Sequence, residues 1–131
     1  MIYLLDACVL IALTSGGHAH KQRCETWFSG IREFATCPTV EGSLVRYLLF
    51  TKESSATAQF ILGHFNMRDG HQFWADSESY STIDLSQVRG HKQTIDAYRV
   101  SMVRHHPDSQ LATLDEALAA LYPDDVYLIP Q

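Results

Sequence analysis

Short apolar runs alternate with segments of helical periodicity along the chain, and this alternation constrains the fold more than any other feature. Runs of strand length cover residues 2–5, 33–37, 72–75, 111–114 and 126–129. Helical spacing covers about 8–14, 19–30, 39–50, 54–66, 94–105 and 117–121. Strands that alternate with helices indicate a parallel sheet with helices on both faces. We therefore predict an α/β fold, with residues 1–131 as a single domain and 77–92 as an irregular connection.

Two threonines mark the expected starts of helices. Thr39 precedes one helical pattern of apolar residues, and Thr94 precedes another. A hydroxyl just before a helix accepts a hydrogen bond from the first helical turn, so we predict an N-cap at each threonine. Glu41 and Asp96 then fall in the first turns of these two helices.

Four acidic residues are expected at one edge of the predicted sheet. Asp6 and Asp115 directly follow apolar strands, while Glu41 and Asp96 lie in helices that begin at the same edge. Carboxylates gathered there raise one another's pKa, and a divalent cation with oxygen ligands, Mg²⁺ or Mn²⁺, relieves that repulsion. Each acid alone also has a structural explanation, because acids are common in first helical turns and after strands.

The charge balance of the chain bears on its partners. Its net charge is −5, and nucleic-acid binding depends on Lys and Arg that neutralise phosphates. A nuclease is compatible with this balance if clustered carboxylates hold cations that supply a positive field. Arg46, Lys92, Arg99 and Arg104 are candidates for RNA phosphate contacts, although Arg99 and Arg104 fit a solvated helix face equally well.

Cysteine usage and hydropathy indicate the compartment. The three cysteines have no metal-type spacing, which suits a reducing cytosol. No apolar run approaches the roughly 20 residues that span a bilayer, and no secretory signal is recognisable. We therefore expect a cytoplasmic protein that does not interact with membranes.

Four motifs spread over the chain carry the predicted acids. They are residues 4–11 (LLDACVLI), 39–46 (TVEGSLVR), 90–98 (GHKQTIDAY) and 111–115 (LATLD). In order and spacing they resemble the motifs of PIN domains, in particular the VapC toxins of bacterial toxin–antitoxin pairs. The resemblance implies a PIN-like three-layer sandwich, in which helices flank a mostly parallel central sheet. It also implies an endoribonuclease that cleaves RNA with Mg²⁺ or Mn²⁺.

The resemblance assigns roles to individual residues. Asp6 and Asp96 would be the principal metal ligands, with Glu41 and Asp115 acting through water or orienting the attacking water. Thr113 lies two residues before Asp115 on a strand, so it points to the same side and can hydrogen-bond a ligand, although a β-branched residue there equally fits a strand. We expect Asp6→Asn to abolish activity and to leave the fold intact or slightly stabilised, because it removes charge repulsion.

Partners follow from the same resemblance. We expect an RNA substrate, a cognate VapB-like antitoxin and a homodimer, and the apolar residues of 39–50 and 54–66 offer surface for a protein partner. An arginine of the antitoxin would pair with the acidic cluster and displace the metal. Cys8 departs from the Asn, Ser or Thr of many family members, and a thiol is a weak hydrogen-bond donor.

The residues also bear on three alternative functions. A phosphatase of the haloacid-dehalogenase type needs a second Asp two residues after Asp6, where this chain has Cys8. A non-catalytic interaction module with the PIN fold would lack one of the four acids, and all four are present. A phosphate-accepting receiver domain needs paired acids before its first loop and a late Lys, which the sequence does not supply.

Overall fold

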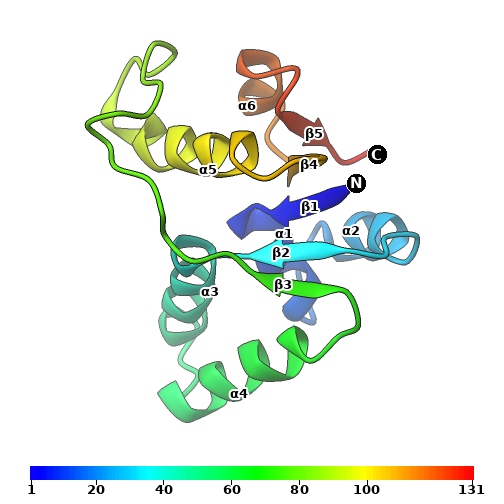
Figure 1. Ribbon diagram of the computed structural model, residues 1–131. Coiled ribbons are helices and arrows are strands. Elements are labelled where there is room, and N and C mark those ends of the chain that lie inside the picture. The colour runs from blue at the N-terminus through cyan, green and yellow to red at the C-terminus, as the bar shows by residue number, and fades with distance from the viewer.

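A sheet of five parallel strands forms the centre of the computed structural model, which describes residues 1–131 (Figure 1). The strand order is β3-β2-β1-β4-β5. Leu4 of β1 pairs with Ala35 of β2 on one side and with Leu111 of β4 on the other, which makes β1 the middle strand. The strand bounds are β1 Ile2–Leu5, β2 Phe34–Thr36, β3 His71–Phe73, β4 Ser109–Thr113 and β5 Val126–Leu128.

Helices cover both faces of the sheet, which confirms the predicted three-layer α/β architecture (Figure 1). Four helices of the N-terminal half pack together on one face: α1 Ala7–Thr14, α2 Lys21–Phe28, α3 Pro38–Phe50 and α4 Ser55–Asn66. The other face carries α5 Thr94–Arg104, preceded by a 3-10 turn at His91–Gln93, and α6 Glu116–Leu121. Right-handed crossovers between parallel strands produce this division. None of the helices has both the length and the hydropathy needed to cross a membrane.

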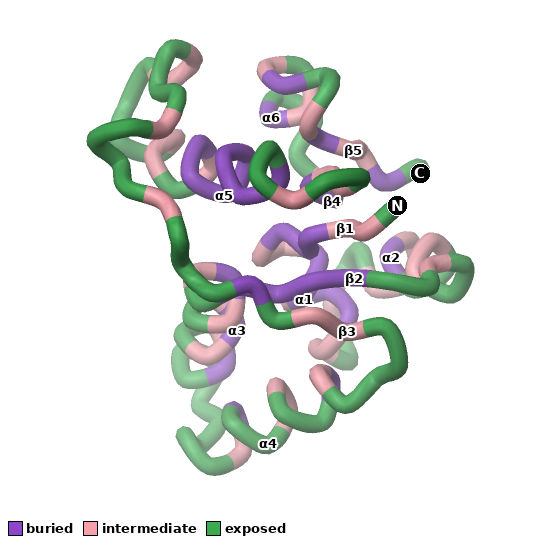
Figure 2. Tube along the Cα trace, viewed as in Figure 1, coloured by how far each residue is buried: buried purple, intermediate pink, exposed green.

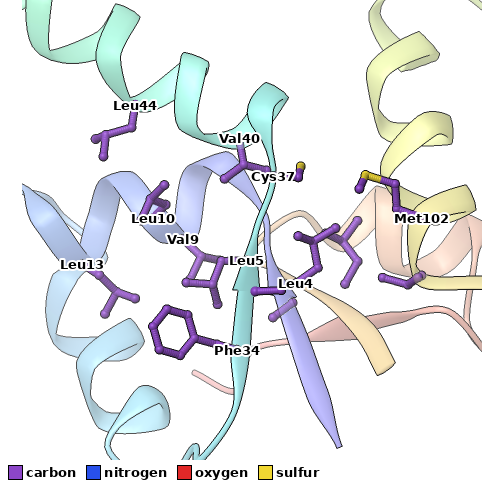
Figure 3. Close-up of a cluster of buried hydrophobic side chains, with 14 of the residues drawn as sticks. Leu4, Leu5, Val9, Leu10, Leu13, Phe34, Cys37, Val40, Leu44 and Met102 are labelled. Atoms are coloured by element: carbon purple, nitrogen blue, oxygen red, sulfur yellow. The ribbon is translucent and has the colours of Figure 1, made fainter. Parts of the chain in front are cut away.

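The hydrophobic core lies between the sheet and its helices. Leu4 and Leu5 of β1, Leu10 of α1 and Val40 of α3 are fully buried members of this core (Figure 3). Helix α5, on the opposite face of the sheet, is buried on all its sides, since every residue from Ala97 through Val103 is buried (Figure 2). A polar side chain in the middle of α5 therefore needs a partner inside the protein.

The connection before α5 explains why that helix is buried all round. The Tyr98 hydroxyl of α5 donates a hydrogen bond to Asp76 Oδ1 at 2.8 Å, and Tyr80 packs against the Tyr98 ring. At the end of α5, Arg104 forms an ion pair with Asp84 at 3.1 Å. The irregular segment predicted between 77 and 92 thus covers the side of α5 that faces away from the sheet.

The direction of the chain reverses beside β1, and this reversal locates the expected binding edge. From β1 the chain adds β2 and β3 on one side, then crosses to place β4 and β5 on the other. Open parallel sheets bind ligands at the carboxyl ends of the strands where such a reversal occurs. Here those ends are Leu5 of β1, followed by Asp6, and Thr113 of β4.

Both predicted threonine N-caps are wrong. Helix α3 begins at Pro38 with Cys37 as its N-cap, because the fixed φ of proline suits the first helical position and its missing N–H costs nothing there. Thr94 is the first residue of α5, and Gln93, the end of the 3-10 turn, precedes it. The hydroxyl of Thr39 is therefore free to serve another partner.

Candidate functional site

Asp6 lies at the carboxyl end of the middle strand, and its carboxylate is buried. It is the N-cap of α1, where its Oδ1 accepts a hydrogen bond from the Ala7 N–H at 2.8 Å. Its Oδ2 accepts one from the Thr113 hydroxyl of the neighbouring strand β4 at 2.7 Å. Because β1 and β4 pair up to Leu5 and Ala112, the residues that follow lie side by side, and Thr113 fixes the orientation of the carboxylate.

Arg99 of α5 is the cationic partner of Asp6. Its Nη1 lies 2.9 Å from Asp6 Oδ1, and its Nε donates to the Thr39 hydroxyl at 3.2 Å. Only 7% of the Arg99 side chain is exposed. The expectation that Arg99 contacts RNA phosphates or lies on a solvated helix face is therefore wrong, because α5 is buried all round and its guanidinium turns into the site.

Asp96 stands one helical turn before Arg99. Its Oδ1 is 4.0 Å from Arg99 Nη1. Burial, with the charges of Asp6 and Asp115 adding to its effect and the charge of Arg99 opposing it, raises the pKa of Asp96 from 3.8 to about 6. One guanidinium thus does not neutralise the carboxylates around it, and this edge of the sheet keeps an excess of negative charge.

Asp115 completes the acidic group on the far side of Asp96. It lies two residues beyond β4 and caps α6, with Oδ1 accepting hydrogen bonds from the N–H groups of Ala117 at 2.9 Å and Leu118 at 3.1 Å. Asp115 and Asp96 line a small cavity of about 60 Å³ between the starts of α5 and α6. The two helix N-termini make this cavity favourable for negatively charged side chains and groups.

Glu41 has different neighbours from the other three acids. Its Oε2 accepts hydrogen bonds from the Thr36 hydroxyl at 2.7 Å and from Asn66 Nδ2 at 3.0 Å. His71 Nε2 lies 2.8 Å from the same Thr36 oxygen, and since that hydroxyl gives its proton to Glu41, His71 must donate. Burial lowers the pKa of His71, and Glu41 opposes that shift. Sequence patterns did not predict Thr36, Asn66 or His71 as site residues.

The structure therefore divides the four predicted acids into two groups. Asp6, Asp96 and Asp115 interact electrostatically at the ends of β1 and β4, whereas Glu41 is hydrogen-bonded beside β2 and β3. No three Asp, Glu, His or Cys side chains are close enough together to hold a metal ion in this arrangement. The donors themselves suit a hard cation, because the first three acids offer carboxylate oxygens in excess of the available positive charge.

Cys8 contacts the site in the place where many family members carry a hydroxyl or an amide. Its Sγ is 3.7 Å from Asp6 Oδ2 and 3.8 Å from the Thr113 hydroxyl. Burial, with the charge of Asp6 adding to it, raises the pKa of Cys8 to about 12. The thiol therefore stays protonated and adds no negative charge beside Asp6.

The sequence signal for Arg99 was its spacing from Asp96. Residues three apart in a helix lie on one face, so a side chain three residues after a predicted ligand is placed beside it. This contact also changes the stability that we expect of Asp6→Asn. Asp6 is half of a buried ion pair, and Asn keeps an acceptor oxygen but loses the charge, so the change leaves the buried guanidinium of Arg99 without its counter-charge and should be destabilising.

Comparison with proteins of known sequence identifies full-length relatives. The chain is 42% identical over 131 residues to Ribonuclease VapC29 of Mycobacterium tuberculosis, an alignment that covers 99% of this chain and 98% of the relative. It is 30% identical over 125 residues to Ribonuclease VapC38 of the same organism, which covers 90% and 88% of the two chains. No family model matches the chain.

Solved structures with the same fold are more distant in sequence. Mycobacterium tuberculosis VapC20, described as a sarcin–ricin loop cleaving toxin, superposes with a TM-score of 0.67 at 15% identity and covers 99% of this chain and 100% of its own. VapBC2 from Rickettsia felis, bound to a DNA fragment from its promoter, gives a TM-score of 0.64 at 14% identity with the same coverage.

The raised pKa of Asp96 predicts an unusual pH dependence of stability without metal. Because the folded-state pKa is about 6, above the usual value of 3.8 for an aspartate, ionised Asp96 costs stability, and that cost grows as the pH rises from about 4 to about 6. In EDTA, Asp96→Asn should therefore melt at a higher temperature than the wild type at pH 7.5. This advantage should shrink as the pH falls toward 4.

Asp84→Asn provides a control of opposite sign. Hydrogen bonds from Ser86, with Arg104 adding to them, lower the pKa of Asp84 to about 2, so ionised Asp84 stabilises the fold above pH 4. Its replacement should lower the melting temperature at pH 7.5. A melting temperature of Asp96→Asn that stays equal to the wild-type value from pH 4.5 to 8 would contradict the prediction for Asp96.

Proposed function

The chain belongs to the VapC family of PIN-domain ribonucleases, the toxins of toxin–antitoxin pairs, and we propose that it cleaves RNA at the acidic edge formed by Asp6, Asp96, Asp115 and Glu41. The observation that carries this proposal is the gathering of three carboxylates where the chain direction reverses beside β1: Asp6 and Asp96 flank Arg99, and Asp96 and Asp115 line one cavity. Such an edge is the usual ligand site of an open parallel sheet.

We propose Mg²⁺ or Mn²⁺ as the cofactor, with Asp6 and Asp96 as principal ligands and Asp115 and Glu41 acting through water. A divalent cation supplies Lewis acidity and positive charge for hydrolysis of a phosphodiester by water. Thr36 and Asn66 both bind Oε2 of Glu41, and its Oε1 carries no hydrogen bond, so Glu41 can act through a water from that oxygen.

The chain's own residues prepare the site for this task. The Ala7 N–H and the Thr113 hydroxyl hold the Asp6 carboxylate in one orientation. Asp115 is held in the same way by the first turn of α6. Lys92 is exposed in the 3-10 turn beside Gln93, which lines the cavity with Asp96, so Lys92 is placed to contact an RNA phosphate.

Asp96→Asn is the sharpest test of the catalytic proposal, because it keeps the Asp6–Arg99 pair and is expected to stabilise the metal-free fold. Its RNA cleavage should fall by more than about 100-fold, since changes to groups that only support metal ligands already cost 10–100-fold. Wild-type cleavage should stop in EDTA and return with Mn²⁺ or Mg²⁺. Cleavage that persists in EDTA, or in folded Asp96→Asn, would refute the proposal.

The ends of the cleaved RNA test the mechanism separately. A ribonuclease that uses the substrate 2′-hydroxyl leaves a cyclic phosphate and needs a general base and acid, usually histidines. No histidine forms a hydrogen bond or an ion pair with Asp6, Asp96 or Asp115. Attack by water should instead leave a 5′-phosphate and a free 3′-hydroxyl, which mass spectrometry of a cleaved oligonucleotide identifies. A 2′,3′-cyclic phosphate would exclude this mechanism while leaving the family membership intact.

We further propose that the chain forms a homodimer and binds a VapB-like antitoxin. Large apolar side chains at the end of α3 and along α4 are exposed, among them Phe50 at 83%, Phe60 at 71% and Met67 at 80%. Large apolar side chains that are exposed on neighbouring elements are typical of a protein interface. The VapBC2 complex among the structural neighbours supports an antitoxin partner.

A pair of surface variants tests the proposed dimer. Light scattering after size exclusion should give a dimer mass for the wild type at micromolar concentration, and Phe60→Ser should shift it toward monomer because it removes an exposed apolar anchor. Leu85→Ser, an exposed apolar residue in the connection before α5, should leave the mass unchanged. A wild type that is monomeric at that concentration would argue against the dimer.

A further inference from the structure

The guanidinium of Arg99 is held at two points inside the acidic site. Its Nη1 is 2.9 Å from Asp6 Oδ1, and its Nε donates to the Thr39 hydroxyl at 3.2 Å. The Asp96 carboxylate lies 4.0 Å from the same Nη1. Arg99 thus stands between the two carboxylates that are proposed as the principal metal ligands.

Asp6 has no spare hydrogen-bonding capacity in this arrangement. Its Oδ1 accepts from the Ala7 N–H and from Arg99, and its Oδ2 accepts from Thr113 and from the Cys8 thiol. Two carboxylate oxygens offer about four acceptor positions in all. A cation that binds Asp6 must therefore displace one of these donors, and Arg99 is the only charged one.

We propose that Arg99 is a tethered counter-cation that occupies the site in the metal-free protein and moves aside when a divalent cation binds. The inference rests on the proposed carboxylate metal site. It gives Arg99 two opposite effects: the guanidinium stabilises the metal-free fold by pairing Asp6, and it weakens metal binding because the entering cation must separate that pair and meets a like charge nearby.

The opposite possibility is that Arg99 is a positioning residue that orients Asp6 for the metal. The two roles differ in sign. If Arg99 orients Asp6, its removal weakens metal binding; if Arg99 competes, its removal strengthens metal binding. The structure favours competition, because Thr113 and the Ala7 N–H already orient Asp6 without Arg99.

Calorimetric titration of the full-length, metal-free chain with Mn²⁺ alone distinguishes these roles without measuring activity. Arg99→Gln removes the charge and should bind Mn²⁺ about tenfold more tightly, or better, because like charges a few ångströms apart in a partly buried site repel strongly. Arg99→Lys keeps the charge and should stay within about threefold of the wild type. Thr39→Val removes the second anchor and should tighten binding by about two- to fivefold, the effect of one lost hydrogen bond.

Arg104→Gln is the matched control, because it removes the same charge from the same helix. Arg104 pairs with Asp84 and Asp125 at the other end of α5, and its side chain is 39% exposed. This variant should leave the Mn²⁺ affinity within about twofold of the wild type, as expected for a charge screened by solvent. An increase equal to that of Arg99→Gln would assign the effect to net charge and overturn the proposal.

Thermal melting gives a second readout. In EDTA, Arg99→Gln should melt below the wild type, because Asp6 loses its counter-charge, and Mn²⁺ should raise its melting temperature by more than it raises that of the wild type.

Should Arg99→Gln fail to fold even with Mn²⁺, the Thr39→Val titration decides the question. Unchanged or weaker Mn²⁺ binding in Arg99→Gln or Thr39→Val, beside a wild type that binds, overturns the role of Arg99 alone. Failure of the wild type and of every variant to bind Mn²⁺ overturns the metal site as well.

Discussion

The ion pair between Asp6 and Arg99 is the interaction on which the acidic edge depends. It joins the end of the middle strand to the buried helix α5 across 93 residues of sequence. A buried pair of charges carries a large desolvation cost and persists only when the remaining donors and acceptors are satisfied. Thr39, Thr113 and the Ala7 N–H meet that condition here. The pair therefore fixes where α5 sits and, with it, where Asp96 faces.

The parts of the site that sequence patterns predicted are those that depend on single strands. Asp6 follows an apolar run and lies at the end of β1, and Thr113 lies on the same edge at the end of β4. Placing them together needed only the rule that parallel strands end at one edge. The layers of the fold were predictable for the same reason, since they follow from the alternation of strands and helices.

The parts that were missed depend on packing between distant segments. Arg99 has the spacing of a helix-surface residue, and nothing local shows that residues 76–84 cover that side of α5. The two threonine N-caps failed in a similar way, because Pro38 and a 3-10 turn decide where α3 and α5 begin. Freed from capping, Thr39 anchors Arg99. Glu41 lies two residues further along α3, a rotation of about 200°, and so points to Thr36 instead.

Pairing of arginines with acids inside the chain also limits which charged side chains remain available to bind RNA or a protein partner. Of the four cations expected near phosphates, Arg99 and Arg104 are bound to carboxylates of the chain itself. This leaves Arg46 and Lys92 as the exposed cations of that set. Attraction of RNA to the acidic edge then depends on added cations.

An arginine from the proposed antitoxin could not readily pair with Asp6, because Asp6 is already paired with Arg99 within the chain. It would find its carboxylate partners in Asp96 and Asp115, whose charges Arg99 leaves uncompensated.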